Sequence, residues 1–84
     1  MYSILLEHTA EKDLRRLPEH THGRVIASIK KLSSNPRPPG SRKLTGSKND
    51  WRIRVGEYRI VYEISDEIRV VRINRVRHRS EVYR

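Results

Sequence analysis

Two short runs of alternating residues, joined by a dipeptide, constrain this chain more than any other feature. Residues 51–55 read Trp-Arg-Ile-Arg-Val, and residues 58–62 read Tyr-Arg-Ile-Val-Tyr. Because successive side chains of a β-strand point to opposite faces of the sheet, each run is expected to be a strand with one buried and one wet face. The linker Gly56-Glu57 suits a type II′ turn, so the sequence predicts a β-hairpin.

The pairing that this turn imposes sets arginines against each other on the wet face. Arg54 is expected directly across from Arg59, with Arg52 on the same face. Like charges placed opposite each other destabilise a sheet. A chain that tolerates three close guanidinium groups is therefore expected to bind a polyanion there. The pairs expected on the buried face are Val55 with Tyr58, Ile53 with Ile60, and Trp51 with Tyr62.

The net charge of the chain points to the same class of partner. Its 84 residues include 19 Lys plus Arg against 10 Asp plus Glu, which gives a formal net charge of +9. From Arg42 onward lie 12 of the 19 cations, nearly all of them arginine, whose planar fork of donors matches phosphate. Nucleic acid is the expected partner and an acidic protein the next, while a merely solvated basic surface is the alternative that composition leaves open.

Length and composition also set limits on architecture and cofactors. So short a chain predicts a single domain over residues 1–84, because a second core would not fit. The absence of cysteine suits a reducing compartment, and no apolar run is long enough to span a bilayer, so we expect a cytoplasmic protein without a membrane partner. The histidines at 8, 20, 22 and 78 are not grouped on one face, so we expect no metal site and no cofactor.

The remaining segments predict one strand, two helices and a second hairpin. Residues 2–8 are mostly apolar and are expected to form a buried strand. Thr9 is expected to cap a short helix that Pro18 ends, and a second helix should run from Glu19 to about Ser34. Residues 35–41 hold three prolines and a glycine, which predicts a crossing loop. The second helix presents an apolar stripe of Val25, Ile26, Ile29 and Leu32.

These elements predict an α+β fold, in which an N-terminal strand and an antiparallel two-helix hairpin precede a three-stranded antiparallel meander. The helices are expected to pack on one face of a single sheet. After Tyr62 the strand should continue to Ile64, turn at residues 65–67 and return over residues 68–76. With a turn at residues 66–67, Tyr62 would face Val71, and Arg72 would join the hairpin arginines, although a slip of one residue would reverse that assignment.

Four segments are informative together: Lys43-Leu44-Thr45-Gly46, residues 51–55, residues 58–62, and Arg77-His78-Arg79-Ser80-Glu81-Val82-Tyr83. In this order they resemble the RelE toxin family, the members of the RelE/ParE superfamily that cleave mRNA. The resemblance covers essentially the whole chain and implies the same order of strands and helices. It also implies an endoribonuclease that acts on mRNA in the ribosomal A site, and a cognate antitoxin that binds and neutralises it.

The resemblance also implies roles for single residues. Arg52 and Arg54 occupy positions where the best-known family member has two lysines, one of them a general base or charge stabiliser. Arg59 matches an arginine that steadies the phosphate in the transition state. Arg77 matches an arginine assigned as general acid, and Tyr83 a tyrosine that stacks on or orients the nucleotide. We further expect Lys43, Arg72 and Arg79 to bind RNA.

The two departures from lysine leave the general base unassigned, because arginine is effectively never deprotonated. His78 is the spare catalytic candidate, since imidazole titrates near neutral pH; an exposed tail residue without a role is the equal alternative. The RNA itself supplies the nucleophile, because its 2′-OH attacks the adjacent phosphate. The protein has to orient that attack, neutralise the charge that develops and move two protons.

Two other functions remain open from the sequence. A ParE-like protein of similar fold would inhibit DNA gyrase by binding, without chemistry, and would not need Arg54, Arg59, Arg77 and Tyr83 together. A nucleic-acid-binding module without catalysis is the weaker alternative. The antitoxin implied by the resemblance should bring an acidic or amphipathic segment, directed at either the basic face or the helix pair.

Overall fold

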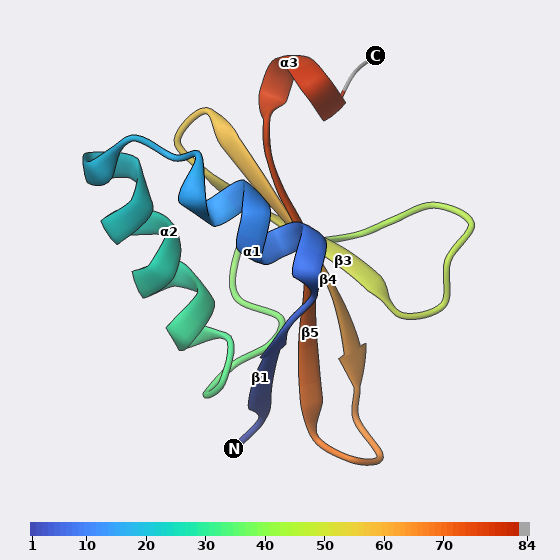
Figure 1. The fold of residues 1–84 in the computed structure, drawn as a ribbon. Helices are drawn as coiled ribbons and strands as arrows, with labels where there is room; N and C mark the ends of the chain where they lie inside the picture. Colours follow the sequence, from blue (N-terminus) through green and yellow to red (C-terminus); the bar gives the residue numbers. More distant parts are fainter. Residues whose placement is uncertain (83–84) are drawn as a thin grey trace.

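A mixed β-sheet with two helices on one side forms the molecule (Figure 1). The computed structural model describes residues 1–82, and within them the strand order is β1-β5-β4-β3-β2. The predicted α+β class and the helical cover on one face are confirmed. The elements are β1 (Ser3–Leu6), α1 (His8–Arg15), α2 (Glu19–Lys31), β2 (Arg42–Lys43), β3 (Asp50–Val55), β4 (Tyr58–Ser65), β5 (Val70–His78) and α3 (Arg79–Val82).

Strand β1 differs from the prediction in its burial, and its direction makes the sheet mixed. It pairs with β5 in parallel, from Ser3 opposite Val70 to Leu6 opposite Ile73, so the sheet is mixed. A buried strand was the wrong expectation, because β1 is an edge strand: Leu5 and Leu6 are 48% and 39% exposed. The additional strand β2 lies at the other edge of the sheet, in a stretch for which the sequence predicted no strand.

The hairpin of β3 and β4 has the predicted register. Val55 lies opposite Tyr58, and Arg54 lies opposite Arg59. Gly56 has φ of +58°, a left-handed conformation that glycine adopts without steric cost and that the first central position of a type II′ turn requires. The alternation of side chains therefore continues unbroken through the turn, which separates a buried face from a face lined with arginine.

The register of β4 with β5 differs from the prediction by two residues. The turn spans residues 66–69, with Arg69 at φ +54°, and Tyr62 lies opposite Ile73 rather than Val71. A shift of two preserves the alternation of faces, so Arg72 does lie on the face of the hairpin arginines. Beyond this point Asn74 has no partner in β4 and forms a β-bulge, which the sequence did not lead us to expect.

Both helices end earlier than predicted, at Arg15 and Lys31. The N-cap position of α1 is Glu7, and the expected cap Thr9 instead donates a hydrogen bond of 2.8 Å to the backbone carbonyl of Asn74. No helix of the described chain is long and apolar enough to cross a membrane. The core between helices and sheet consists of Ala10, Leu14, Val25, Ile29, Leu32, Ile53, Val55, Ile60, Tyr62, Ile64, Val71, Ile73 and Val76.

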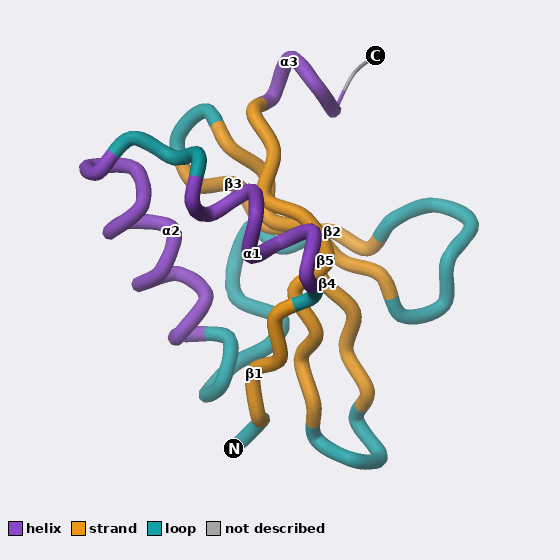
Figure 2. The backbone as a smooth tube through the Cα atoms, in the orientation of Figure 1, coloured by secondary structure: helices purple, strands orange, loops and turns teal. Residues whose placement is uncertain are grey.

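Two loops flank the small strand β2, as the tube in Figure 2 shows. The loop after α2 is fixed from both sides: the buried Tyr62 hydroxyl donates to the Pro36 carbonyl at 2.8 Å, and Arg37 pairs with Asp66 at 2.8 Å. Burial raises the pKa of Tyr62 to about 12, so its hydroxyl keeps the donated proton. The loop between β2 and β3 extends away from the sheet. The crossing loop predicted for residues 35–41 is confirmed.

Candidate active site

Five arginines form two rows on the face of the sheet opposite the helices. In the first row, Arg54 of β3 lies opposite Arg59 of β4, which lies opposite Arg77 of β5. In the second row, Arg42 of β2 lies opposite Arg52 of β3. Residues directly opposite each other in antiparallel strands have Cβ atoms about 5 Å apart on the same face. Register alone therefore brings these five arginines together, and we call them the basic face.

The bulge at Asn74 is what places Arg77 in this row. Without it, the register of Tyr62 with Ile73 would continue and Arg77 would lie opposite Tyr58, on the core side. With it, Arg77 lies opposite Arg59, and Val76 turns inward and is buried. One extra residue in a strand therefore turns Arg77 to the wet face.

The arginines of the basic face have few compensating charges. Arg54 donates from Nε to the Gly56 carbonyl at 3.3 Å, and Arg59 donates from Nη1 to the Tyr58 carbonyl at 3.2 Å. Within residues 1–82, ion pairs to Arg42, Arg52, Arg54 or Arg59 are absent, and Arg77 has one, to Glu81 at 3.4 Å. An arrangement of opposed and mostly uncompensated cations is a favourable site for an anion.

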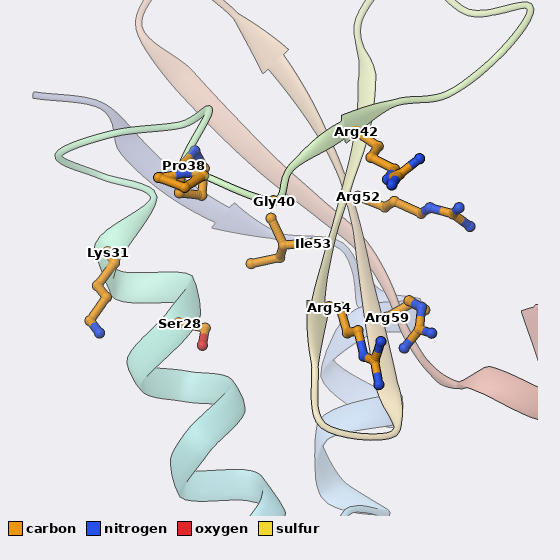
Figure 3. Close-up of a pocket in the computed structure, with 10 residues that line it drawn as sticks. Ser28, Lys31, Pro38, Gly40, Arg42, Arg52, Ile53, Arg54 and Arg59 are labelled. Atoms are coloured by element: carbon orange, nitrogen blue, oxygen red, sulfur yellow. The ribbon is translucent and has the colours of Figure 1, made fainter.

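A groove of about 670 Å³ runs along the edge of β3 beside these arginines. Figure 3 shows Arg42, Arg52, Arg54 and Arg59 extending to the same side, with Ser28 and Lys31 of α2 across the edge of the strand. The loop after α2 closes one end with Pro38, Pro39 and Gly40. The groove thus offers room for an extended anionic chain that contacts several guanidinium groups in succession.

Three residues expected to bind RNA lie outside this constellation or are paired. Lys43 lies opposite Trp51, so alternation directs it to the other face of the sheet from Arg42. Arg72 lies on the arginine face but is paired with Glu7 at 3.2 Å and Glu63 at 3.5 Å. Arg79 is paired with Glu57 at 3.3 Å. Tyr83 lies outside the described residues.

His78 lies on the opposite side of the sheet from Arg77. It is opposite Tyr58 in the register, and the two rings meet edge to face with centroids 5.3 Å apart. Its Nδ1 accepts the backbone N–H of Ser80 at 3.2 Å, so in the neutral ring the proton belongs on Nε2. A ring in this state has no free lone pair for a proton from substrate, and the structure does not bring His78 to the basic face.

Sequence reasoning missed two cations beside the groove, Arg42 and Lys31. Arg42 lies in a strand of 2 residues, too short to show a period, and Lys31 reaches the groove from the last turn of α2 through tertiary packing alone. In the part of the chain that is described, there is no group of three His, Cys, Asp or Glu side chains able to hold a metal ion.

Known proteins similar to this chain are toxins. Residues 4–83 match the family described as "ParE toxin of type II toxin-antitoxin system, parDE". The toxin RelG of Mycobacterium tuberculosis is 36% identical over 99% of this chain and 97% of its own length, and the toxin RelE3 of Methanocaldococcus jannaschii is 34% identical over 95% and 93%.

Solved structures of two toxins have the same fold. The isolated Escherichia coli RelE toxin superimposes with a TM-score of 0.82 at 29% identity, covering 99% of this chain and 92% of that one. RelE in the archaeal RelE–RelB complex of Pyrococcus horikoshii gives 0.83 at 25% identity, covering 93% and 94%.

Proposed function

This chain belongs to the ParE toxin family of type II toxin–antitoxin systems and is a RelE-like toxin, and from that premise we propose that it cleaves mRNA in the ribosomal A site. The observation that carries the proposal is the row Arg54, Arg59 and Arg77, in which Arg59 faces a like charge on each side. Such pairs of like charges destabilise the folded sheet. An anionic ligand bound at the row would offset that repulsion.

In the proposed reaction the 2′-oxygen of one nucleotide attacks the adjacent phosphorus while the bond from phosphorus to the 5′-oxygen breaks. The 2′-OH loses its proton and the 5′-oxygen gains one, which leaves a 2′,3′-cyclic phosphate and a 5′-OH. We assign Arg54 and Arg59 to the non-bridging phosphate oxygens, where charge accumulates, and Arg77 to the leaving 5′-oxygen as a hydrogen-bond donor. Arg52 adds charge stabilisation from the neighbouring row, and we propose Tyr83 as the group that stacks on the nucleotide.

The general base remains unassigned in this proposal, which has a consequence for the substrate. The basic face consists of arginines, which do not accept protons. Catalysis then rests on charge stabilisation and on the in-line alignment of the 2′-oxygen, the phosphorus and the 5′-oxygen. The groove is open at the edge of the sheet, so we infer that the ribosome holds the mRNA in that alignment and that free RNA is a poor substrate.

We propose a cognate antitoxin as the second partner. Two of the similar structures, from Pyrococcus horikoshii and Escherichia coli, are complexes of RelE with RelB. A net charge of +9 and a row of arginines of which Arg54 and Arg59 have no ion pair within residues 1–82 favour a partner segment that carries carboxylates. Such a segment would neutralise the toxin by occupying the positions that the RNA phosphates take.

The test is primer extension on an mRNA held in the A site of purified ribosomes, beside the same mRNA free in solution. Addition of the purified chain should produce new stops on the ribosome-bound mRNA and few or none on the free RNA. The absence of cleavage on ribosomes, with a folded sample, would overturn the nuclease proposal.

The matched family takes its description from ParE toxins, so the alternative of a gyrase inhibitor also needs a test. A parallel assay decides it. DNA supercoiling by purified gyrase should be unaffected by the chain if the nuclease proposal is right. Inhibition of supercoiling without mRNA cleavage would favour binding without chemistry. Cleavage in neither substrate and no effect on gyrase would leave only a nucleic-acid-binding module.

A further inference from the structure

Helix α1 contacts β5 at the extra residue of the bulge, Asn74, and again two residues later, at Val76. Thr9 donates from Oγ1 to the backbone carbonyl of Asn74 at 2.8 Å. One turn along the same helix, Asp13 accepts the backbone N–H of Val76 through Oδ2 at 2.9 Å. Strand β1 pairs with β5 only as far as Ile73. Beyond that residue, side chains of α1 form the hydrogen bonds that a neighbouring strand would otherwise provide to the β5 backbone.

Asp13 makes further bonds that set it apart from the other carboxylates. Asp13 is 9% exposed, and among the described residues it is the one charged residue that is buried. Its two oxygens also accept from the Arg75 guanidinium, at 2.9 Å from Nε and 3.3 Å from Nη2. The hydrogen bond to Asp13 raises the pKa of Arg75 above its ordinary value. Asp13 thus joins α1 to the two residues that directly precede Arg77.

The peptide orientation at this point decides which face Arg77 occupies. The N–H of Val76 lies in the peptide plane between Arg75 and Val76, so holding it fixes how Val76 is oriented. Because successive side chains of a strand point to opposite faces, the inward orientation of Val76 sends Arg77 to the wet face. Burial of Val76 favours the same alternation, but an apolar contact has no direction. Hydrogen bonds do have direction, and the Asp13 carboxylate accepts three of them, two from Arg75 and one from Val76.

We propose that Asp13 is a positioning residue of the active site, which holds the β5 bulge so that Arg77 lies across from Arg59. The inference rests on the proposed nuclease function for its kinetic readout. Asp13 lies on α1, on the face of the sheet opposite the basic face, so it is not placed to contact a substrate bound there. Its effect on the reaction passes through Arg77, whose position the bulge determines.

The experiment measures single-turnover cleavage of ribosome-bound mRNA by Asp13→Asn and Asp13→Ala. The asparagine keeps an oxygen for the Val76 N–H and loses the charge that binds Arg75, whereas alanine loses both. We expect the rate to fall about 10- to 100-fold for alanine and less for asparagine, with ribosome affinity unchanged, because misplacement of a catalytic group affects the chemical step. If the alanine variant does not fold, as judged by circular dichroism, the asparagine variant decides.

Double variants separate positioning from a general loss of structure. Asp13→Asn combined with Arg77→Ala should be no slower than Arg77→Ala alone, because Asp13 acts through Arg77. Combined with Arg52→Ala, on the other row, its effect should multiply. Effects that multiply in both combinations, or a wild-type rate for Asp13→Asn, would overturn the proposal.

A second measurement keeps the inference independent of nuclease activity. The arginine Nε–Hε signals of the ¹⁵N-labelled chain are recorded for wild type and Asp13→Asn. The Arg77 signal should move and the Arg52 signal should stay. If the wild type cleaves no mRNA, the nuclease proposal fails while these signals still decide on positioning; an unmoved Arg77 signal overturns it.

Discussion

At the scale of single residues, Arg59 shows best how stability and function oppose each other in this protein. It is half-buried on β4 and has Arg54 on one side and Arg77 on the other. A neutral glutamine at this position would relieve both repulsions. That an arginine stands there indicates a use for its charge outside the fold.

Arg59→Gln should lower the cleavage rate about 100- to 1,000-fold, the usual effect of removing one donor that stabilises transition-state charge. Its melting temperature should equal or exceed that of wild type, because each opposed pair of like charges costs about 0.2–1 kcal/mol. Cleavage assays and thermal melts on the same sample measure both. A melting temperature several degrees lower would mean that the lost activity reflects unfolding.

His78→Gln tests the one titratable candidate that the sequence offered. We expect cleavage close to the wild-type rate, because His78 lies beside Tyr58 on the other side of the sheet and its Nδ1 accepts from Ser80. A loss of about 100-fold or more with the fold intact would make His78 a catalytic group after all.

At the scale of elements, what the sequence predicts depends on how local the determining contact is. The β3–β4 hairpin was predictable in register, because its turn and alternation lie within one short stretch. The β4–β5 register was not predictable, because Arg69 takes a left-handed conformation that the sequence does not indicate for a residue other than glycine. The bulge did leave a signal: Val71 and Ile73 are two apart but Val76 comes three later, which breaks the alternation.

The candidate site follows the same rule. The pairing of Arg54 with Arg59 could be derived from alternation, whereas Arg77 reaches their row only through the bulge. Arg42 and Lys31 were beyond sequence reasoning, because a strand of 2 residues and a tertiary contact of α2 bring them to the groove.

The contact between Arg37, in the loop after α2, and Asp66 leads us to predict how stability changes in acid. The hydrogen bond from Arg37, and then that from Tyr2, hold the pKa of Asp66 at about 2, below its ordinary value of 3.8. A carboxylate whose pKa is lower in the folded state contributes stability above its unfolded pKa and loses it as pH falls through the folded value. The melting temperature of wild type should therefore fall between pH 3.8 and about 2 more than that of Asp66→Asn. Parallel curves would show that this exposed cluster contributes nothing.

At the scale of the whole molecule, the distribution of charge matters more than its sum. The row of the sheet beyond Arg52 is acidic, with Asp50 opposite Glu63, and Arg72 is neutralised there by Glu63 and Glu7. On this face of the sheet, within the described residues, the cations without an ion pair are therefore Arg42, Arg52, Arg54 and Arg59, which lie together on β2, β3 and the start of β4. A surface of this kind binds an anion at a defined place, whereas a uniformly basic protein would bind it anywhere.

Arg42 and Lys43 allow the central claim to be tested directly, because they are neighbours in β2 and belong to opposite faces. Arg42→Ala and Lys43→Ala remove the same charge one residue apart, so the net charge of the two variants is equal. Cleavage of ribosome-bound mRNA should fall about tenfold for Arg42→Ala, equivalent to ~1.4 kcal/mol, and stay close to wild type for Lys43→Ala. Equal losses, or a larger loss for Lys43→Ala, would contradict the basic face as the active site.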